Sequence, residues 1–207
     1  ATTPSTSSIA VTPMTTTETP TALTIRTGST VLLDQRRVGP RECLTVHSGL
    51  LRVAASRPHE EALDTEPVTL GFLQAGDQLP LDLLRNTRLH LQALTPTQLV
   101  EGCALQPDAG CNSLHDWTLA LLLIRNLHDA EQRIGALLQL LVERLGRRNG
   151  AWYELPLRLT HSELAALSGH TRVTVTRQFS RWREQGLLEQ EAGPDRLLRV
   201  SPELVAA

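Results

Sequence analysis

The spacing of apolar residues changes character near residue 113 of this 207-residue chain. Upstream, short apolar stretches predict β-strands, in residues 42–55, 68–81 and 88–99. Turn residues interrupt these stretches at Ser48-Gly49, Gly76-Asp77 and Thr95-Pro96. We interpret Ser48-Gly49 as the turn of a hairpin and residues 56–67 as a polar loop. Short strands at this spacing predict an antiparallel β-barrel or jelly roll over residues 23–112.

From residue 113 the apolar period becomes helical. Apolar residues recur at intervals of three and four along residues 113–128, at Leu114, Trp117, Leu121, Ile124 and Leu127. Leu119, Leu122 and Leu123 add apolar surface beyond this stripe, so one face can pack on the β-domain and another on a second copy of the chain. We predict a dimerisation helix with the stripe at the dimer interface; complete burial within its own domain is the alternative.

A second helix is predicted in residues 129–148, with one apolar side formed by Ile134, Leu137, Leu138, Leu141 and Leu145. Residues 149–160 are then a loop or short strand that ends near Pro156. Together with the following segments, residues 129–207 are predicted to form a winged helix-turn-helix domain. The predicted fold class is therefore α+β: an antiparallel β-barrel or jelly roll, a long helix, and this helical domain.

The helix-turn-helix signature lies in residues 160–184. Thr160 and Glu163 have the spacing of a capping box, and Gly169 supplies a residue free to adopt positive φ at the turn. Thr171 can cap the next helix, predicted at 172–184. Val175, Phe179 and Trp182 form the buried stripe of that helix, which leaves Arg172, Val173, Thr176 and Arg177 on its exposed side. Residues 187–200 predict two strands around Gly193-Pro194-Asp195, a β-wing.

The charge distribution supports DNA binding by this helix. The net charge of −2 excludes a uniformly basic coat, but residues 158–183 hold five arginines against the single carboxylate Glu163. An isolated arginine run is usually a solvated helix face. Here the capping box, turn glycine, apolar stripe and charge all agree, so we predict a recognition helix whose N-terminal residues meet base edges in the major groove.

The composition argues against a secreted, a membrane-spanning or a metal-binding protein. Residues 1–22 are a Thr/Ser/Pro-rich tract that predicts a disordered tail, without the basic-then-apolar layout of a secretory signal. No apolar stretch approaches the roughly 20 residues of a membrane span, so we expect a cytoplasmic protein with no membrane partner. Cys43, Cys103 and Cys111 form no CxxC pair, and the seven histidines form no HxH or HExxH pair. We therefore expect reduced thiols and no metal site.

The stretch "LTHSELAALSGHTRVTVTRQFSRWREQGLL" resembles the DNA-binding motif of the CRP/FNR family of bacterial transcription regulators. The resemblance extends in weaker form over residues 23–200, where "VHSGLLRV" and "LGFLQAGDQL" resemble the family's barrel turns and residues 113–128 its dimerisation helix. "HTRVTVTR" is especially similar to the nitrogen-control (NtcA-type) branch. The resemblance implies a cyclic-nucleotide-binding-like domain and a homodimer on palindromic double-stranded DNA, with RNA polymerase as a further candidate partner.

The resemblance also implies roles for the exposed residues of the recognition helix. Arg172 and Arg177 carry the base and adjacent backbone contacts, and Thr171, Thr174 and Thr176 lie near phosphates. Val173 stands where the cAMP-receptor branch has a glutamate that reads cytosine. This difference favours a half-site closer to GTA than to TGTGA.

The segment that would bind a cyclic nucleotide departs from the family pattern. Cyclic-nucleotide binders of this family carry Gly-Glu for the ribose and Arg-Ser or Arg-Thr for the phosphate. Residues 75–94 contain neither, and Asp82, Arg85 and Arg88 are the nearest charged groups. We therefore expect no cAMP or cGMP binding, because an anion site needs convergent donors. No cofactor is evident, and 2-oxoglutarate or another small effector remains a candidate.

Two other classes of function compete with a transcription regulator. An enzyme with an appended regulatory domain finds no support, because no GxSxG, P-loop, GxGxxG or paired catalytic carboxylates occur. A protein-interaction module whose winged helix no longer binds DNA is the second alternative, and the exposed Arg172 and Arg177 argue against it.

Overall fold

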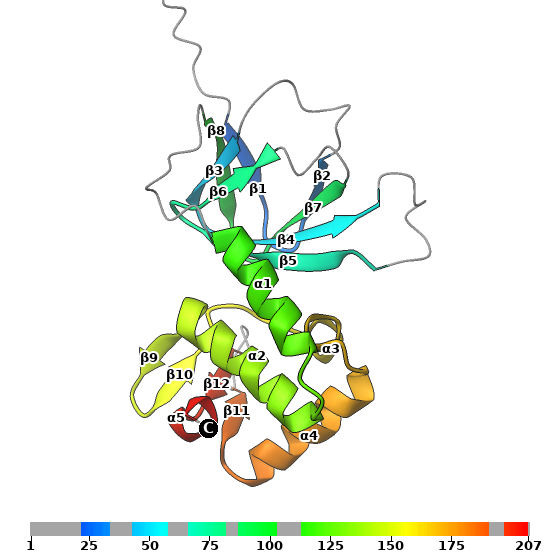
Figure 1. Ribbon diagram of the computed structural model, residues 1–207. Helices are drawn as coiled ribbons and strands as arrows, with labels where there is room; N and C mark the ends of the chain where they lie inside the picture. The colour runs from blue at the N-terminus through cyan, green and yellow to red at the C-terminus, as the bar shows by residue number, and fades with distance from the viewer. Residues whose placement is uncertain are drawn as a thin grey trace, which may run out of the picture.

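The computed structural model describes residues 22–33, 43–57, 66–81, 87–102, 113–190 and 197–206. The predicted disordered tail lies outside these ranges except for Ala22, as do Cys103, Cys111, Asp82 and Arg85. Figure 1 shows a β-sandwich above a mainly helical part, with helix α1 (Ser113–Arg125) leading from one to the other.

The described strands of the sandwich form two four-stranded antiparallel sheets, β1-β8-β3-β6 and β2-β7-β4-β5. Their bounds are β1 (Ala22–Ile25), β2 (Thr30–Leu33), β3 (Cys43–Ser48), β4 (Leu50–Ser56), β5 (Val68–Gln74), β6 (Gln78–Pro80), β7 (Arg88–Ala93) and β8 (Thr97–Gly102). The alternation predicted for β7 is confirmed, since Leu89, Leu91 and Ala93 are all fully buried between the sheets. The predicted jelly-roll class of this domain is confirmed.

The turn at Ser48-Gly49 is not a hairpin, which corrects the sequence-based interpretation. β3 pairs with β6 and β8, whereas β4 pairs with β5 and β7, so the chain crosses between sheets at Gly49. Gly49 has φ +94°, and a Cβ there would collide with the carbonyl oxygen of Pro96. The turns at Gly76-Asp77 and Thr95-Pro96 also connect one sheet to the other. A turn residue predicts a change of direction, but not which strands then pair.

The helical part combines four helices and a small sheet among the described residues. The helices are α2 (Ala130–Leu145), α3 (His161–Ser168), α4 (Arg172–Glu184) and α5 (Pro202–Val205). The sheet has the order β11-β12-β10-β9, from β9 (Arg147–Asn149), β10 (Trp152–Glu154), β11 (Leu188–Gln190) and β12 (Leu198–Val200). β11 and β12 pair antiparallel as the predicted wing, whose tip at 191–196 lies outside the described residues.

Helix α2 confirms the second predicted helix and its buried side. Asp129 caps its N-terminus by accepting a hydrogen bond from the Gln132 amide at 2.9 Å. All five residues of the predicted stripe are buried: Ile134, Leu137, Leu138, Leu141 and Leu145. The helix ends before the predicted residue 148, because residues 147–149 pair with β10 instead.

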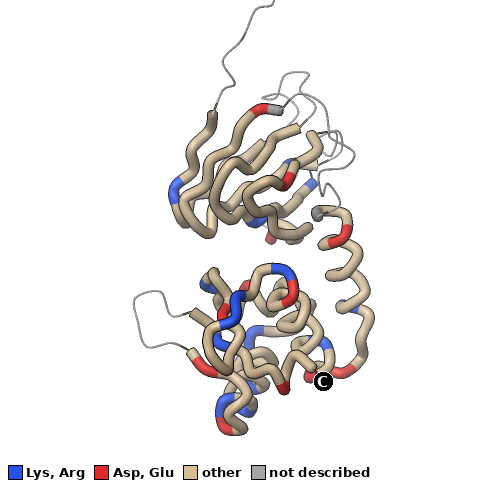
Figure 2. The backbone as a smooth tube through the Cα atoms, turned by 90° about the vertical axis from the view of Figure 1, so that its left-hand side faces the viewer, with Lys and Arg blue, Asp and Glu red and all other residues tan. Residues whose placement is uncertain are grey.

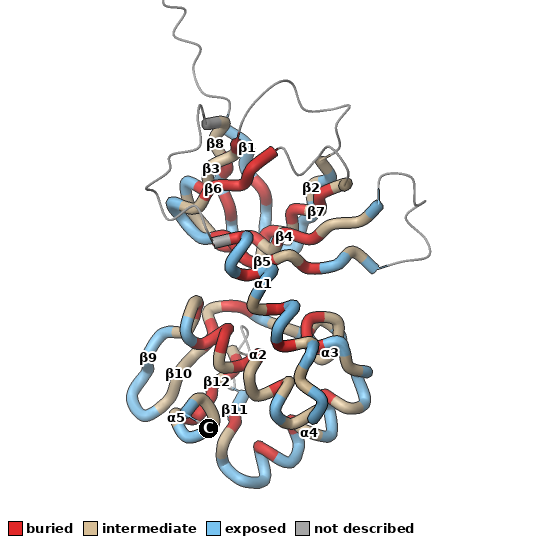
Figure 3. Tube along the Cα trace, viewed as in Figure 1, coloured by how far each residue is buried: buried red, intermediate tan, exposed pale blue. Residues whose placement is uncertain are grey.

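Helix α1 carries its predicted apolar stripe, but the assignment of that stripe to a dimer interface is wrong. Leu114, Trp117, Leu121 and Ile124 are buried within their own chain, and Leu127 lies beyond the helix end at Arg125. The bare apolar side chains of α1 are instead Leu119, Leu122 and Leu123, each nearly three-fifths exposed. Figure 3 shows buried positions of α1 alternating with exposed ones along its length. The apolar pattern predicts two faces and does not say which of them covers the sandwich.

A glycine of β5 lets α1 lie close to the sandwich. A Cβ at Gly71 would collide with the Cβ and ring of Trp117. The Trp117 ring packs edge-on against Phe72 at 5.2 Å, and the Arg144 guanidinium of α2 lies over the same ring at 4.7 Å from its centre. Leu50, Phe72 and Trp117 belong to the same apolar cluster as the helical part. The sandwich keeps its own core between the sheets, and its outer face adds Leu50 and Phe72 to the core of the helical part.

Candidate DNA-binding site

The capping box predicted at the start of α3 is present. The Thr160 hydroxyl accepts a hydrogen bond from the Glu163 amide at 3.2 Å, and the Thr160 amide donates to the Glu163 carboxylate at 2.7 Å. Gly169 ends the helix in the left-handed region at φ +71°. These local contacts fix the turn that sets α4 against α3, as the sequence predicts.

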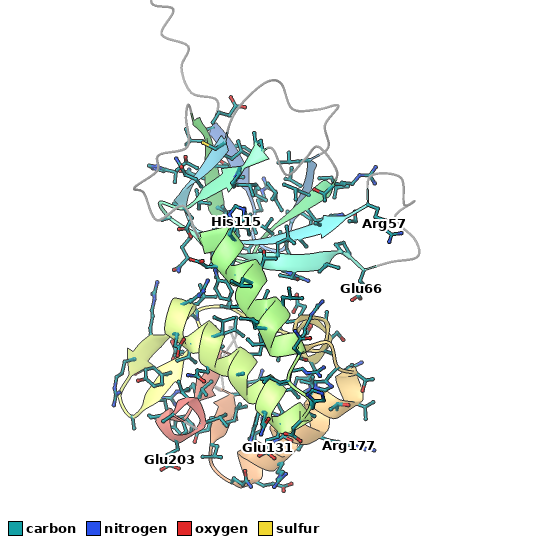
Figure 4. All side chains as sticks on the ribbon, viewed as in Figure 1. Arg57, Glu66, His115, Glu131, Arg177 and Glu203 are labelled. Atoms are coloured by element: carbon teal, nitrogen blue, oxygen red, sulfur yellow. The ribbon has the colours of Figure 1, made fainter. Side chains whose placement is uncertain are left out.

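Helix α4 has the predicted buried and exposed sides. Val175, Phe179 and Trp182 are essentially fully buried. On the other side Arg172, Val173, Thr176 and Arg177 are exposed. Among the described residues, neither arginine has a hydrogen bond or ion pair from its side chain, and Figure 4 shows Arg177 extending away from the helix. Two guanidinium groups on the first two turns are thus available to a ligand outside the chain.

The threonines assigned to phosphate contacts already bond within the helix. Thr171 caps α4 by accepting from the Thr174 amide at 3.2 Å, and the two hydroxyls lie 2.9 Å apart. The Thr176 hydroxyl donates to the carbonyl of Arg172 at 2.8 Å. These bonds orient the first turn, and contact with phosphate by the same groups stays a prediction.

His161 is a residue of the site that sequence reasoning missed. Its Nδ1 lies 2.9 Å from the Thr176 hydroxyl, and its ring packs edge-on against Phe179 at 5.1 Å. Burial, and then the charges of Arg183 and Arg172, lower the pKa of the imidazole. The histidine thus connects the first turn of α3 to the exposed face of α4. No periodic pattern joins residues fifteen positions apart, so only the folded turn reveals this contact.

The basic residues around α4 divide into paired and unpaired ones. Arg181 forms an ion pair with Glu131 of α2 at 3.1 Å, and the Arg183 guanidinium lies 6.0 Å from the centre of the Phe179 ring. Arg158 is exposed. Figure 2 shows that most of the basic segments lie in the helical part of the molecule rather than in the sandwich. The local positive charge predicted from the sequence therefore has an exposed component at the start of α4.

The residues considered for a cyclic nucleotide are only partly within the described structure. Arg88 begins β7, opposite Ser56 of β4. Asp77, at the opposite end of the sheet, closes the turn after β5 by accepting a hydrogen bond from the Gln74 amide at 2.7 Å. Burial raises the pKa of the Asp77 carboxyl, and that hydrogen bond opposes the shift. The Asp77 carboxylate thus serves its own turn.

The described segments show neither a membrane-spanning helix nor a cluster of metal ligands. They contain no helix that is both long and apolar enough to span a bilayer. They also bring together no group of three or more His, Cys, Asp or Glu residues able to hold a metal ion. Cys43 is buried at the start of β3.

A β-sandwich joined by a helix to a winged helix-turn-helix is the architecture of a DNA-binding regulator, and comparison with known proteins identifies the family. Residues 23–114 match the cyanobacterial CRP family N-terminal domain, and residues 132–202 match the Crp-like helix-turn-helix domain. The chain is also 32% identical over 160 residues to the regulatory protein CysR of Synechococcus elongatus, covering 75% of this chain and 74% of that protein. The chain therefore belongs to the CRP/FNR family of DNA-binding transcription regulators, which are not enzymes.

Solved structures share the fold. A CRP/FNR-family transcriptional regulator from Thermus thermophilus has a TM-score of 0.64 at 20% identity, covering 90% of this chain and 99% of that one. FixK2 from Bradyrhizobium japonicum has a TM-score of 0.61 at 18% identity, covering 89% and 93%. The predicted family is confirmed. The match to CysR does not support the finer assignment to the nitrogen-control branch.

Proposed function

We propose that this regulator binds a palindromic DNA site as a homodimer in the cytoplasm, reading each half-site with α4. The observation that carries the proposal is the pair of exposed guanidinium groups, Arg172 and Arg177, on the first two turns of that helix. Arginine forks onto the O6 and N7 of guanine, the commonest specific contact in the major groove. Thr171, Thr174 and Thr176 hold the turn that presents these arginines and can meet adjacent phosphates.

The exposed face of α1 is the proposed dimer interface. CRP-family regulators bind DNA as dimers, and Leu119, Leu122 and Leu123 form an apolar surface on α1 that its own chain leaves bare. Covering three leucines removes apolar area from water, which favours association at roughly 25 cal/mol per Å². RNA polymerase is a further proposed partner of the DNA-bound dimer.

The proposed half-site sequence follows from the absence of a glutamate at position 173 of α4. Val173 is nearly three-fifths exposed and offers a β-branched apolar side chain where a glutamate would accept from the amino group of cytosine. An apolar group can contact the methyl group of thymine instead. We therefore propose a half-site closer to GTA than to TGTGA.

The proposed effector is a small molecule other than cAMP or cGMP. The support is the sequence of residues 75–94, without the Gly-Glu and Arg-Ser or Arg-Thr pairs, together with the use of Asp77 in its own turn. 2-Oxoglutarate is one candidate.

Selection of bound sites from genomic fragments, followed by mobility-shift titration of a selected palindrome, tests this function. Arg172→Ala is expected to cost about 1–3 kcal/mol of binding free energy and to relax specificity at one base, and Arg177→Ala to do similar damage. Arg158→Ala is the matched control, because Arg158 lies off the reading face; it should weaken all sequences equally, if at all. Equal small losses in all three variants contradict the assignment, and no salt-dependent shift at all favours a protein-interaction module instead.

A further inference from the structure

The outer face of sheet β2-β7-β4-β5 holds a half-buried arginine. Arg52 of β4 points away from the sandwich core, since its neighbours Leu51 and Val53 are fully buried between the sheets. Its Nε donates to the Thr69 hydroxyl at 2.9 Å and its Nη1 to the side-chain oxygen of Gln92 at 3.1 Å. The side chain is only 14% exposed. The guanidinium is therefore held in a fixed position across three strands.

The charge of this arginine is incompletely balanced. The nearest carboxylate among the described residues is that of Glu163, with 3.7 Å between Nη1 and Oε1, beyond ordinary hydrogen-bond length. Glu66, which precedes β5 and is labelled in Figure 4, acts on Arg52 only through longer-range attraction. Burial lowers the pKa of Arg52, and the two glutamates oppose that shift. A half-buried cation whose ion pair with Glu163 is longer than a hydrogen bond favours an anion that can approach more closely.

A cavity of ≈ 150 Å³ opens beside Arg52. Its lining also includes Thr30, Pro67, His90 and Gln92. His90 bonds to the Ser56 hydroxyl at 2.9 Å, while burial first, and then Arg88 and Arg52, lower its pKa. The lining thus combines a guanidinium with hydroxyl, amide and imidazole groups. The volume lies below the roughly 300–1,000 Å³ of pockets for drug-sized ligands, so a small anion fits better than a nucleotide.

The same arginine connects the sandwich to the DNA-binding part. Glu163 belongs to the capping box of α3, where one carboxylate oxygen, Oε2, accepts from the amide and hydroxyl of Thr160 at 2.7 and 2.9 Å. The other oxygen, Oε1, faces Arg52. α3 contacts β5, and Figure 1 shows it below β4 and β5. An anion that bonds to Arg52 would therefore compete with the first helix of the helix-turn-helix.

We propose that this cavity is a binding site for a small oxyanion or carboxylate, which takes a charge-assisted hydrogen bond from Arg52 in place of its long contact with Glu163. The proposal deepens the proposed function, on which it rests for the role of the ligand as the regulator's effector. Occupation of the site would loosen the contact between the sandwich and α3. The effector site would then lie on the outside of the sandwich, facing the helix-turn-helix.

Isothermal calorimetry on the full chain tests the site directly, without DNA. Two probes separate the sources of the anion: inorganic phosphate, and 2-oxoglutarate as a small carboxylate, each against sodium chloride at equal ionic strength. We expect saturable binding of at least one probe. Arg52→Gln should weaken that binding by about tenfold or more, the usual effect of losing a hydrogen bond to a charged group. Arg26→Gln, which removes an exposed cation beyond β1, is the matched control and should bind as the wild type does.

Glu163→Gln should change the affinity for the probe in the opposite direction. Glutamine also serves at this position of a capping box, so α3 keeps its cap while Arg52 loses its competitor. Glu163→Gln should bind the same probe more tightly than the wild type, and this readout decides the matter even where Arg52→Gln fails to fold. The proposal is overturned when neither probe binds above the chloride control, when Arg26→Gln weakens binding as much as Arg52→Gln, or when Glu163→Gln binds no tighter. Because DNA is absent, such a failure leaves the proposed DNA-binding function standing.

Discussion

At the scale of single residues, His161 joins α3 and α4, the two helices of the helix-turn-helix. Its ring is packed on Phe179 and bonded to Thr176, and burial lowers its pKa. A histidine with a pKa depressed in the folded state favours the neutral form there, so protons bind more readily to the unfolded chain. The stabilisation is complete above the unfolded pKa of about 6.5 and is lost as the pH falls toward the folded value.

We therefore predict that acid destabilises the protein partly through His161. In His161→Gln, the free energy of unfolding should fall less between about pH 7.5 and 5.5 than it does in the wild type, because the titrating group is gone. Urea titrations at a series of pH values measure this difference. An unchanged slope in His161→Gln would contradict the role of burial.

Residue-level prediction from the sequence was good where the signal was local. The capping box follows from the three-residue spacing of Thr160 and Glu163. The exposed side of α4 follows from the apolar stripe of Val175, Phe179 and Trp182. The contact of His161 with Thr176 depends on how α3 and α4 cross, which no local spacing encodes.

At the scale of elements, the position of α1 depends on the missing side chain at Gly71 of β5. Gly71 leaves room for Trp117, which lets the apolar stripe of α1 lie flat on the sandwich. The sequence predicted the stripe and the second apolar face correctly, but assigned the stripe to the wrong partner. Hydrophobic periodicity reports that a face is buried and carries no information about which surface buries it. The strand pairing around Gly49 was missed because a turn residue does not indicate which strands pair on either side of it.

Gly71→Ala should destabilise the protein by about 1–3 kcal/mol, the usual cost of forcing an extra methyl group into a packed contact. Thermal and urea unfolding measure the loss. Gly135→Ala in α2 is a matched control: a Cβ there meets nothing within 4 Å, and replacing a helical glycine should stabilise by about 0.5–1 kcal/mol. Opposite signs for the two glycine-to-alanine changes are the expected result; a stabilising Gly71→Ala would show that α1 is not seated as described.

Leu122→Glu combined with Leu123→Glu should convert the proposed dimer to monomers and weaken binding to a full palindrome. Two carboxylates placed on each bare face would repel those of the partner and remove the apolar area that drives association. Sedimentation velocity measures the mass, and mobility-shift titration measures the affinity. Leu23→Glu combined with Leu32→Glu changes two exposed leucines of β1 and β2 and should leave both unchanged. A double variant at 122 and 123 that stays dimeric would remove α1 from the interface.

At the scale of the whole molecule, Gln74 of β5 ties the sandwich to the helical part by donating to the carbonyl of Arg144 at 3.1 Å, and α1 and α2 are joined to the DNA-binding part by further contacts. The end of α1 contributes one, because Arg125 donates to the carbonyls of Ala166 and Leu167 at 2.5 and 3.2 Å. Arg133 of α2 bonds to the carbonyl of Leu127 in the connection between α1 and α2. Reading two half-sites needs recognition helices about 34–36 Å apart, so these contacts bear on how the proposed dimer would place its two copies of α4.

Saturating cAMP or cGMP should change neither the melting temperature nor the affinity for DNA. A ligand shifts a population only when it binds one state more tightly, and residues 75–94 lack the groups through which a cyclic nucleotide could do so. A specific ligand at 100 times its dissociation constant would stabilise the fold by about 2.7 kcal/mol, which a melting curve detects. A cAMP-dependent shift that disappears in Arg88→Ala would contradict this prediction.

The position of Trp117 has an optical consequence. The chain contains three tryptophans, and only Trp117 lies where the sandwich, α1 and α2 meet, between Phe72 and the guanidinium of Arg144. Trp182 is enclosed in the core of the helical part, and Trp152 lies on its small sheet beside Arg199. With Trp152 and Trp182 replaced by phenylalanine, the emission spectrum of the remaining indole would report on this junction alone. The molecule thus carries its own fluorescent probe at the junction between the sandwich and the helical part.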